Sequence, residues 1–415
     1  MKLTKLEKSW ILYDVANSAF ILLVSTIIPI YFDYLGELGG LSETQYLAYW
    51  SYAASIVTLI VAVLAPILGT MADRKNYKKP IFLVMLVIGC VGCVTLAFMQ
   101  QWLAFLVVFI ITKIGYTGAN VFYDAMLTDV TTDERMDNVS AQGYAWGYIG
   151  SCIPFVVCLV FVLFYDSFGI TMGTAMGISF VITALWWFGM STPLLKKYKQ
   201  THYVEAVPGA VKATFKQLGH TLVDIAKTKS ILFFYIAFFF YIDGVYTIIE
   251  EATAYGTALN LDSTGLLLAL LVTQLVAFPC SIIYGRLAKK VKSELLISIS
   301  IIAYTCITIY AVFMTQQYQF WILAVCVGMF QGGIQALSRS YFGKIIPPEK
   351  SGNYFGVLDI CGKGASFLGT LTVGVVTQIT QKSNLGVSGL IVFFILGFIF
   401  FQMSVKEREK EKAQG

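Results

Sequence analysis

Several ionisable residues of this chain lie inside long apolar segments, where a charged side chain is costly to bury. They are Asp14, Lys113, Asp124, Asp243, Glu250, Arg339, Asp359 and Lys363. Within membrane-spanning helices, such groups normally face the protein interior and mark the route of a substrate or an ion. They do not form the nucleophile–base pair or the ligand cluster of an enzyme or metal site, so we expect no catalysis, no metal and no cofactor.

Polar residues recur at helical intervals in these segments. In residues 102–128, Lys113, Tyr116, Asn120 and Asp124 are three or four residues apart and therefore share one face of a helix. The segments containing Asp14, Asp243 and Arg339 carry similar polar stripes. We predict a substrate-binding set drawn from these four segments: Asn17, Lys113, Tyr116, Asn120, Asp243, Tyr246, Glu250, Gln331 and Gln335.

A second predicted set acts in gating or in coupling to an ion gradient: Asp14, Asp73, Arg74, Asp124, Arg339, Asp359 and Lys363. Asp359 and Lys363 are four residues apart in one segment, which allows an internal ion pair. Arg339 is the expected partner of Asp124, because Lys113 lies about three helical turns away from Asp124. Asp124 then either takes up a proton during transport or forms a permanent charge lock, and the sequence is compatible with both.

The elements that must position these residues are long apolar runs. Of the 415 residues, 57% are hydrophobic and 13% are charged, about half the charged share of a soluble protein. A helix needs ~20 apolar residues to cross the hydrocarbon core of a bilayer. Twelve runs of this kind are present: 10–33, 46–72, 80–99, 102–128, 140–165, 171–192, 230–257, 263–287, 293–315, 319–345, 352–380 and 385–404. We predict an all-α membrane protein with two six-helix bundles, 1–192 and 230–415, joined by a polar cytoplasmic linker, 193–229.

Positive charge indicates which side of the membrane each loop faces. Of the 29 Lys and Arg residues, all but four lie in the N-terminal segment, the loops on its side of the membrane or the C-terminal tail. The exceptions are Lys113, Arg339 and Lys363 within spans, and Lys382 in a loop on the other side. Because positive loops stay in the cytoplasm, we expect both termini inside the cell. We also expect a monomeric protein in the plasma membrane. The basic clusters are too short and scattered for a nucleic-acid groove, so the expected partners are a small-molecule substrate, the lipid bilayer and protons.

Two loops indicate an internal repeat. Gly69 is followed by Asp73-Arg74 and a basic cluster after the second span, and Gly285 is followed by Lys289-Lys290 after the eighth. The first loop resembles the signature of the major facilitator superfamily, although Lys75-Asn76-Tyr77 stands where a glycine is expected. We expect Gly69 to let two helices approach closely, Asp73 to cap a neighbouring helix, and Arg74 to bridge a cytoplasmic gate.

A narrower resemblance extends along the whole chain. Tyr13-Asp14-Val15-Ala16-Asn17-Ser18-Ala19 is similar to the Tyr-Asp-Trp-Ala-Asn-Ser-Ala signature of the autophagy-related vacuolar effluxer family and its bacterial relatives. Further matches are Phe122-Tyr123-Asp124-Ala125, the glycines Gly143, Gly147 and Gly150, and the stretch from Gln335 to Ser340. The glycines also permit close helix packing. The resemblance implies a twelve-helix facilitator fold, in which spans 1, 4, 7 and 10 line a central cavity, and efflux of amino acids.

Together these features favour a secondary transporter that works by alternating access and exports small zwitterions. An ammonium from Lys113 and a carboxylate from Asp243 or Glu250 suit the two charges of an amino acid. The aromatic content of 15% leaves open a lipid-like or drug-like amphiphile as the substrate. A membrane sensor without transport activity is the third hypothesis, but it would usually carry a folded soluble module, for which the linker is too short and too polar.

Overall fold

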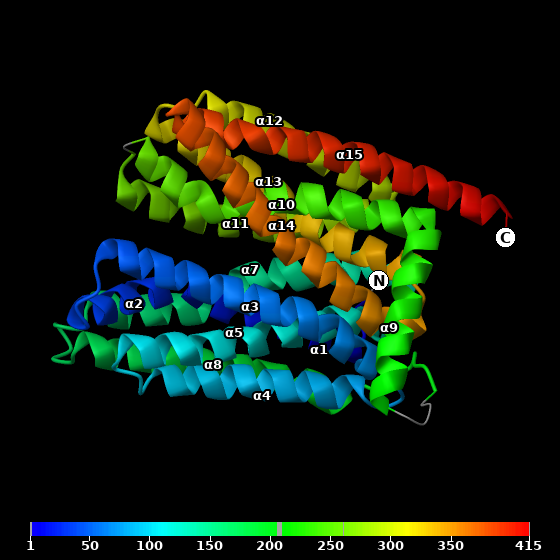
Figure 1. Ribbon diagram of the computed structural model, residues 1–415, viewed down its shortest axis with the longest axis horizontal. Helices are drawn as coiled ribbons and strands as arrows, with labels where there is room; N and C mark the ends of the chain where they lie inside the picture. Colours follow the sequence, from blue (N-terminus) through cyan, green and yellow to red (C-terminus); the bar gives the residue numbers. More distant parts are fainter. Residues whose placement is uncertain (1, 206–209, 260, 415) are drawn as a thin grey trace.

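The computed structural model describes residues 2–205, 210–259 and 261–414, and this part of the chain is almost entirely helical (Figure 1). The one β-type pairing found in the described part is a single bridge between Arg74 and Val204. The helices are α1 (Lys5–Ser25), α2 (Ile27–Leu38), α3 (Glu43–Ala72), α4 (Lys78–Leu96), α5 (Trp102–Ala125), α6 (Leu127–Val130), α7 (Asp133–Leu163), α8 (Met172–Lys197), α9 (Ala210–Lys227), α10 (Lys229–Ala258), α11 (Ser263–Leu287), α12 (Ser293–Val312), α13 (Gln317–Ile345), η1 (Pro348–Lys350), α14 (Ser351–Thr380) and α15 (Ser383–Gln414). The predicted all-α fold is confirmed.

Local sequence explains where several helices begin. Thr4 and Glu7 form a reciprocal capping box at the start of α1. Asp262 caps α11 by accepting a hydrogen bond from the Gly265 amide. These side chains satisfy amide groups that have no partner within the helix, so they fix each start at one residue.

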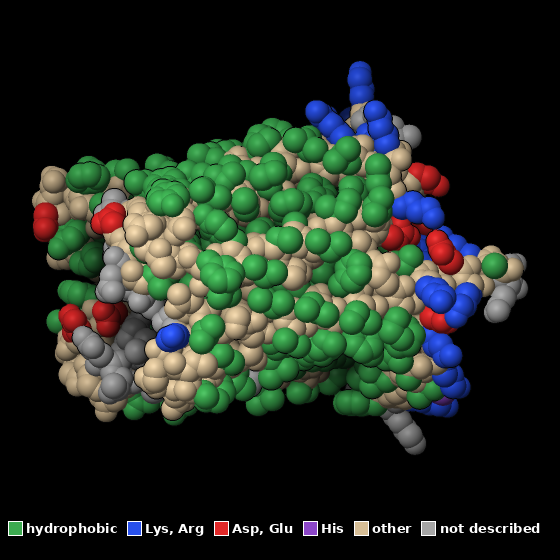
Figure 2. Space-filling model, turned by 90° about the horizontal axis from the view of Figure 1, so that it is seen from above, with side chains coloured by type: hydrophobic (Ala, Val, Ile, Leu, Met, Phe, Trp, Pro, Cys, Tyr) green, Lys and Arg blue, Asp and Glu red, His purple; other side chains and the backbone are tan. Residues whose placement is uncertain are grey.

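The lengths and the surface of the helices fit a membrane. Within the described residues, eleven helices are long and apolar enough to cross a bilayer. The twelfth is the 30-residue α14, in which Leu368–Thr380 is an apolar stretch. Hydrophobic side chains cover the flank of the molecule, and Lys and Arg side chains gather at one end (Figure 2). The chain is therefore a multi-pass membrane protein.

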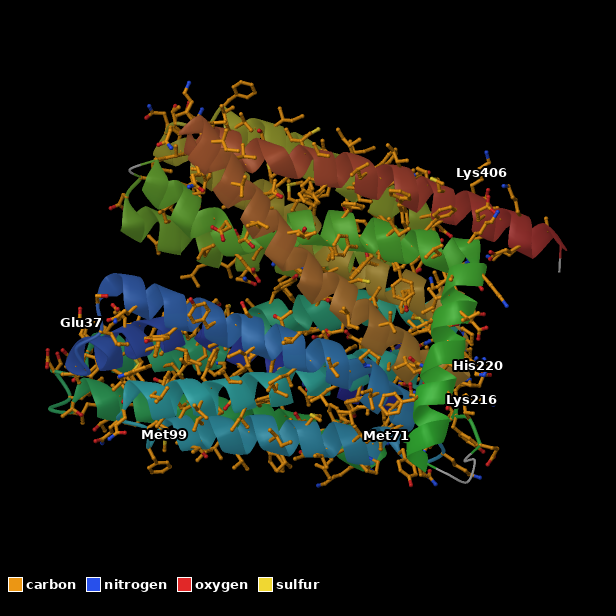
Figure 3. All side chains as sticks on the ribbon, viewed as in Figure 1. Glu37, Met71, Met99, Lys216, His220 and Lys406 are labelled. Atoms are coloured by element: carbon orange, nitrogen blue, oxygen red, sulfur yellow. The ribbon has the colours of Figure 1, made fainter. Side chains whose placement is uncertain are left out.

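The end where Lys and Arg gather also carries α9 and the C-terminus (Figure 1), and we call it the basic end. Lys216, His220 and Lys406 lie at the basic end, and Glu37 lies at the opposite end (Figure 3). Figure 1 shows α9 crossing the basic end at a steep angle to the long helices of both halves.

Each half of the chain builds its own hydrophobic core. The core of α1–α8 includes Phe20 and Trp187, whose rings stack with centroids 5.4 Å apart. The core of α10–α15 includes Tyr304 and Phe394, which stack at 5.6 Å. The halves meet where α3 packs against α14 and where α7 packs against α11. This paired arrangement is expected of two halves related by an internal repeat.

Several elements differ from the sequence prediction. α7 begins at Asp133 instead of at residue 140, and α15 continues to Gln414 instead of ending at residue 404. The first span, predicted over 10–33, consists of two helices, because Thr26 leaves the helical conformation with φ −133° and ψ −67°. The predicted polar linker, 193–229, contains the 18-residue helix α9, and α8 continues to Lys197. A search for continuous apolar runs does not detect α9, because only part of an amphipathic helix is apolar.

Candidate functional site

Arg339 on α13 links the second half of the chain to the first. Its Nη2 lies 3.1 Å from Oδ2 of Asp14 on α1, and its Nη1 lies 3.0 Å from Oδ1 of Asp124 on α5. Its Nε and Nη2 also donate hydrogen bonds to the hydroxyl and the backbone carbonyl of Ser140 on α7, at 2.9 and 3.2 Å. The expected contact between Arg339 and Asp124 is present, and Asp14 is an additional partner. One guanidinium therefore holds three helices of the first half.

Aromatic rings enclose this guanidinium. The Cζ of Arg339 lies 4.4 Å from the ring centroid of Tyr144, 4.6 Å from that of Trp10 and 5.4 Å from that of Tyr123. The Trp10 indole donates a hydrogen bond to the Tyr123 carbonyl at 3.0 Å, which fixes one side of the cage. Arginine suits such a site because its edges pair with carboxylates while its flat faces stack on rings.

Three glycines of α7, Gly143, Gly147 and Gly150, make room for α1. A Cβ atom at Gly143 would lie 2.5 Å from Oδ2 of Asp14, and one at Gly150 would lie 2.5 Å from a methyl carbon of Val15. Both separations are too short for a side chain, so the close packing predicted for these glycines is confirmed. Gly143 in particular provides the space in which the Asp14 carboxylate meets Arg339.

Asp73 forms a second link between the halves, at the basic end. It follows α3, and its two oxygens accept hydrogen bonds from the amides of Gly352 at 2.7 Å and Asn353 at 2.9 Å, in the first turn of α14. A carboxylate is favourable there because the amides at a helix N-terminus lack partners within the helix. Gly69 packs so closely on the Gly352 carbonyl that no side chain fits. Gly69 and Asp73 thus make the contacts expected from their sequence pattern.

The loop after Asp73 keeps a turn that glycine usually makes. Asn76 has a φ of 66°, in the left-handed region that Asn tolerates better than most other residues with side chains. Asn76 therefore substitutes for the glycine of the superfamily signature. Arg74 is buried, and its backbone pairs with Val204 of the linker. The predicted role of Arg74 in bridging a gate stays a prediction.

Two other charged clusters at the basic end were missed by the sequence analysis. Lys78 is fully buried, and its Nζ lies 3.1 Å from Oδ2 of Asp129 and 2.8 Å from the Ser351 hydroxyl at the start of α14. Asp137 on α7 accepts hydrogen bonds at 2.5–2.6 Å from three second-half side chains: Ser293, Ser340 and Lys344. In the sequence, basic residues near the span ends indicate only topology, because no local pattern shows which carboxylate they meet.

The predicted substrate-binding residues lie on α1, α5, α10 and α13, and the structure joins some of them. The hydroxyl of Tyr13 donates a hydrogen bond to Oδ1 of Asn120 at 3.4 Å. The Lys113 ammonium lies 5.2 Å from the ring centroid of Tyr116. Of the others, Asn17 and Gln331 are buried, Tyr246 and Gln335 are half-buried, and Glu250 is exposed.

Asp243 lies between α10 and α14 and is fully buried. Its Oδ1 accepts hydrogen bonds from the Thr247 hydroxyl at 3.2 Å and the Gly369 amide at 3.1 Å. Its Oδ2 accepts no hydrogen bond in the part of the chain that the structure describes. Asp359 is half-buried, and the side chain of Lys363 lies outside the described residues, so their expected ion pair stays a prediction.

Comparison with known proteins identifies the family. Residues 33–414 match the family described as vacuole effluxer Atg22 like. The chain belongs to the Atg22-like family. It is 41% identical over 418 residues to YxiO of Bacillus subtilis (strain 168), an uncharacterized MFS-type transporter, with coverage of 100% of this chain and 98% of YxiO. It is 26% identical over 286 residues to autophagy-related protein 22-2 of Aspergillus clavatus, which covers 61% of this chain but only 46% of the fungal protein.

Solved structures share the fold of this Atg22-like chain. The major facilitator superfamily transporter FucP, in its outward conformation, matches with a TM-score of 0.71 and 14% identity, over 96% of this chain and 97% of FucP. The human organic anion transporter MFSD10 matches with a TM-score of 0.69 and 13% identity, over 96% of this chain and 99% of MFSD10. These similarities confirm the fold predicted from the sequence. Together with the 41% identity to YxiO over the whole chain, they show that the Atg22-like chain is a transporter of the major facilitator type.

The contact between α3 and α14 in this Atg22-like transporter can be tested at Gly69. We call the packing of α3 on α14 at the basic end the closed contact. A Cβ added by Gly69→Ala would overlap the Gly352 carbonyl, so we expect the closed contact to weaken by about 1–3 kcal/mol. Spin labels at the exposed positions Lys75 and Glu349 would report the distance between the two halves. We expect longer distances in Gly69→Ala. Gly374→Ala on α14 is the matched control, because nothing lies within 4 Å of a Cβ there; equal distances in the two variants would refute the role of Gly69.

The same labels test the titration of Asp73. Burial raises the pKa of Asp73 to about 7, although the Lys78 ammonium and the two amide donors act against that rise. If the contact opens, water reaches the carboxyl and its pKa falls toward its ordinary value near 4. The closed contact is therefore favoured at low pH and loses this advantage as the pH rises through about 7. We expect the closed population to fall between pH 5 and 8. Asp73→Asn should remove most of this pH dependence, whereas the control Asp166→Asn, at an exposed position, should keep it. Equal pH dependence in the wild type and both variants would contradict the assignment of this titration to Asp73.

Proposed function

We propose that this chain exports small zwitterions such as amino acids from the cytoplasm by alternating access, with proton coupling, and that its basic end faces the cytoplasm. The observation that carries the proposal is the Arg339 cluster. The cluster places one cation of the second half between two carboxylates of the first. These ion pairs must therefore break when the halves separate at the basic end. The family description as a vacuole effluxer supports a role in transport.

The distribution of contacts supports alternating access. Polar contacts of Arg339, Asp73, Lys78 and Asp137 join the two halves toward the basic end. In contrast, α14 begins beside α3 at this end and diverges from it toward the other end (Figure 1). A closed gate on one side and diverging halves on the other are expected of one of the two end states of a rocking transporter. The halves would then be the rigid units, 1–192 and 230–415, with 193–229 as the linker.

A zwitterionic substrate is supported by the charges that the central helices carry. Lys113 on α5 belongs to the first half, and Asp243 and Glu250 on α10 belong to the second. A substrate with a carboxylate and an ammonium could therefore engage both halves at once, which ties its binding to their relative position. The competing proposal, an amphiphile, is favoured by the aromatic content of 15%.

The substrate class can be tested by thermal stabilisation of the purified protein across amino acids, peptides, sugars and amphiphiles. A ligand of the folded state raises the unfolding temperature, and the rise grows with the logarithm of the ratio of its concentration to its dissociation constant. We expect stabilisation by amino acids and its loss in Lys113→Ala. Stabilisation by amphiphiles that is equal in wild type and Lys113→Ala would favour the alternative substrate.

The orientation can be tested by cysteine labelling in intact cells. Cysteines at Glu37 and Asp262 should react with a membrane-impermeant reagent added outside, and cysteines at Lys75 and Lys290 should react only after the cells are permeabilised. All four positions are exposed, so accessibility to the reagent depends on the side of the membrane. Lys78 begins α4, directly after the loop that contains Lys75, but a cysteine there would not serve this test, because the position is fully buried. Labelling of the two lysine-site variants from outside would reverse the proposed orientation.

A further inference from the structure

α9 presents an exposed face on which apolar and basic side chains lie next to each other. Phe215, Leu222 and Val223 are 55%, 49% and 48% exposed. Spacings of seven and eight residues place them on one side of the helix, two turns apart. Lys216 and Lys227 are also exposed beside this apolar strip. An exposed apolar strip flanked by lysines is unusual on a surface that contacts only water.

The other side of α9 is fixed to the protein. Thr221 and Ile225 are buried, and α9 packs against α3, α10 and α14. The Thr221 hydroxyl accepts a hydrogen bond from the Asn353 amide group at 2.9 Å, and Asp224 pairs with Lys350 at 3.2 Å. The exposed strip is therefore held in a defined direction.

The position of α9 brings this strip to the boundary of the bilayer. Only Thr228 separates α9 from α10, which crosses the membrane from Lys229 onward. α9 must therefore lie at the depth where α10 enters the bilayer. Lys216 and His220 lie on the side of α9 that faces away from the helix bundle (Figure 3), so this polar side is directed to the lipid headgroups and to water, away from the acyl chains.

We propose that the exposed face of α9 docks on an anionic lipid surface. Phe215, Leu222 and Val223 insert at the boundary between headgroups and acyl chains, and Lys216 and Lys227 contact lipid phosphates. Charge complementarity selects lipid as the occupant, because the strip combines apolar side chains with lysines and lies beside a membrane-spanning helix.

Docking of α9 has a consequence for the contact between the halves. Asn353 donates its side-chain amide to Thr221 on α9 and its backbone amide to Asp73 after α3. A docked α9 therefore holds the first turn of α14 where Asp73 binds it. Anionic lipid should accordingly favour the closed arrangement at the basic end.

The location of the strip can be measured with single spin labels on the full-length protein in vesicles. We expect a label at Leu222 to be protected from a water-soluble nickel relaxation agent and accessible to oxygen in vesicles of phosphatidylcholine with phosphatidylglycerol. A label at His220 should show the reverse. Equal access of the nickel agent to both labels in these vesicles would overturn the proposal. Protection of Leu222 from both the nickel agent and oxygen would also overturn it, because low access to both agents indicates cover by protein, such as a second copy of the chain.

The charge requirement can be measured with paired substitutions. In anionic vesicles, we expect the double variant Lys216→Gln, Lys227→Gln to lower the equilibrium constant for docking of α9 by about fivefold for each lysine removed. Lys196→Gln with Lys197→Gln is the matched control, because it removes two exposed lysines from the end of α8. The distance between labels at Lys75 and Glu349 should shorten with phosphatidylglycerol in wild type and in the control, but not in the α9 variant. If the α9 variant and the control respond alike to phosphatidylglycerol, lipid recognition by α9 is refuted.

Discussion

Replacing Arg339 by alanine is expected to reduce transport by about 100-fold or more. The change leaves Asp14 and Asp124 as unpaired carboxylates in a buried site, and removing one member of a buried ion pair typically costs about 3–5 kcal/mol. Because Arg339 belongs to the second half and its partners to the first, the loss falls on the state in which the basic end is closed. The measurement is the initial rate of substrate flux in proteoliposomes.

Arg408 provides the matched control for Arg339. It is also a partly buried arginine of the second half, with Glu294 at 3.6 Å and the Tyr341 ring centroid at 4.9 Å, and both partners belong to that same half. We expect Arg408→Ala to change transport less than about twofold, since its salt bridge joins no separating surfaces. Equal losses in the two variants would show that Arg339 acts only through the stability of the second half.

A variant in which all three charges are removed separates folding from gating. Asp14→Asn, Asp124→Asn and Arg339→Gln together leave no uncompensated charge in the site, so the thermal stability lost in Arg339→Ala should return. Transport should stay low, because the site no longer contains charges that pair and separate. Recovery of wild-type transport in this triple variant would refute the gating role of the cluster.

The second large effect is expected for Asp124→Asn when a pH gradient drives transport. The side chain of Asp124 is 33% exposed, whereas that of Asp14 is 9% exposed, so water can reach Asp124 more readily. We expect that when the halves separate and Arg339 withdraws, the loss of this nearest cation outweighs the gain in hydration, so that the Asp124 carboxylate takes up a proton more readily. We expect Asp124→Asn to abolish the proton-driven component of transport and to preserve binding of substrate.

The measurement compares flux with and without an imposed pH gradient in liposomes. Asp14→Asn is the matched comparison, because it removes the other carboxylate of the same cluster. We expect it to slow transport but to keep the response to the gradient. An unchanged response to the pH gradient in Asp124→Asn would refute the coupling role of Asp124. The remaining interpretation of the pair would then be a permanent charge lock between Asp124 and Arg339.

Lys113→Ala tests substrate binding separately. We expect at least about tenfold weaker binding of an amino acid, the loss typical of a charge-assisted hydrogen bond. Lys382→Ala, an exposed lysine at the opposite end, should bind as wild type does. Unchanged affinity in Lys113→Ala would remove Lys113 from the site.

The sequence by itself determined the features that depend on local composition and spacing. Apolar runs of sufficient length predicted the membrane-spanning helices, because the thickness of the bilayer sets their minimum length. Helical periodicity placed Lys113, Asn120 and Asp124 on one face of α5, since residues three or four apart lie above one another on a helix. The pattern around Gly69 and Asp73 predicted a close helix approach and a helix cap. The separation of Lys113 from Asp124 along the helix led to the expected pair of Asp124 with Arg339.

Only the tertiary structure decided which distant residues meet. Lys78 and Ser351 are 273 positions apart, and no local pattern indicates that they share a hydrogen bond. The cage of Trp10, Tyr123 and Tyr144 around Arg339 likewise combines three helices, α1, α5 and α7. The presence of α9, and the side of it that packs on α14, likewise follow only from the fold. The physical reason is the same in each case: periodicity fixes the face of a helix on which a residue lies, but the packing of the two halves fixes what that face contacts.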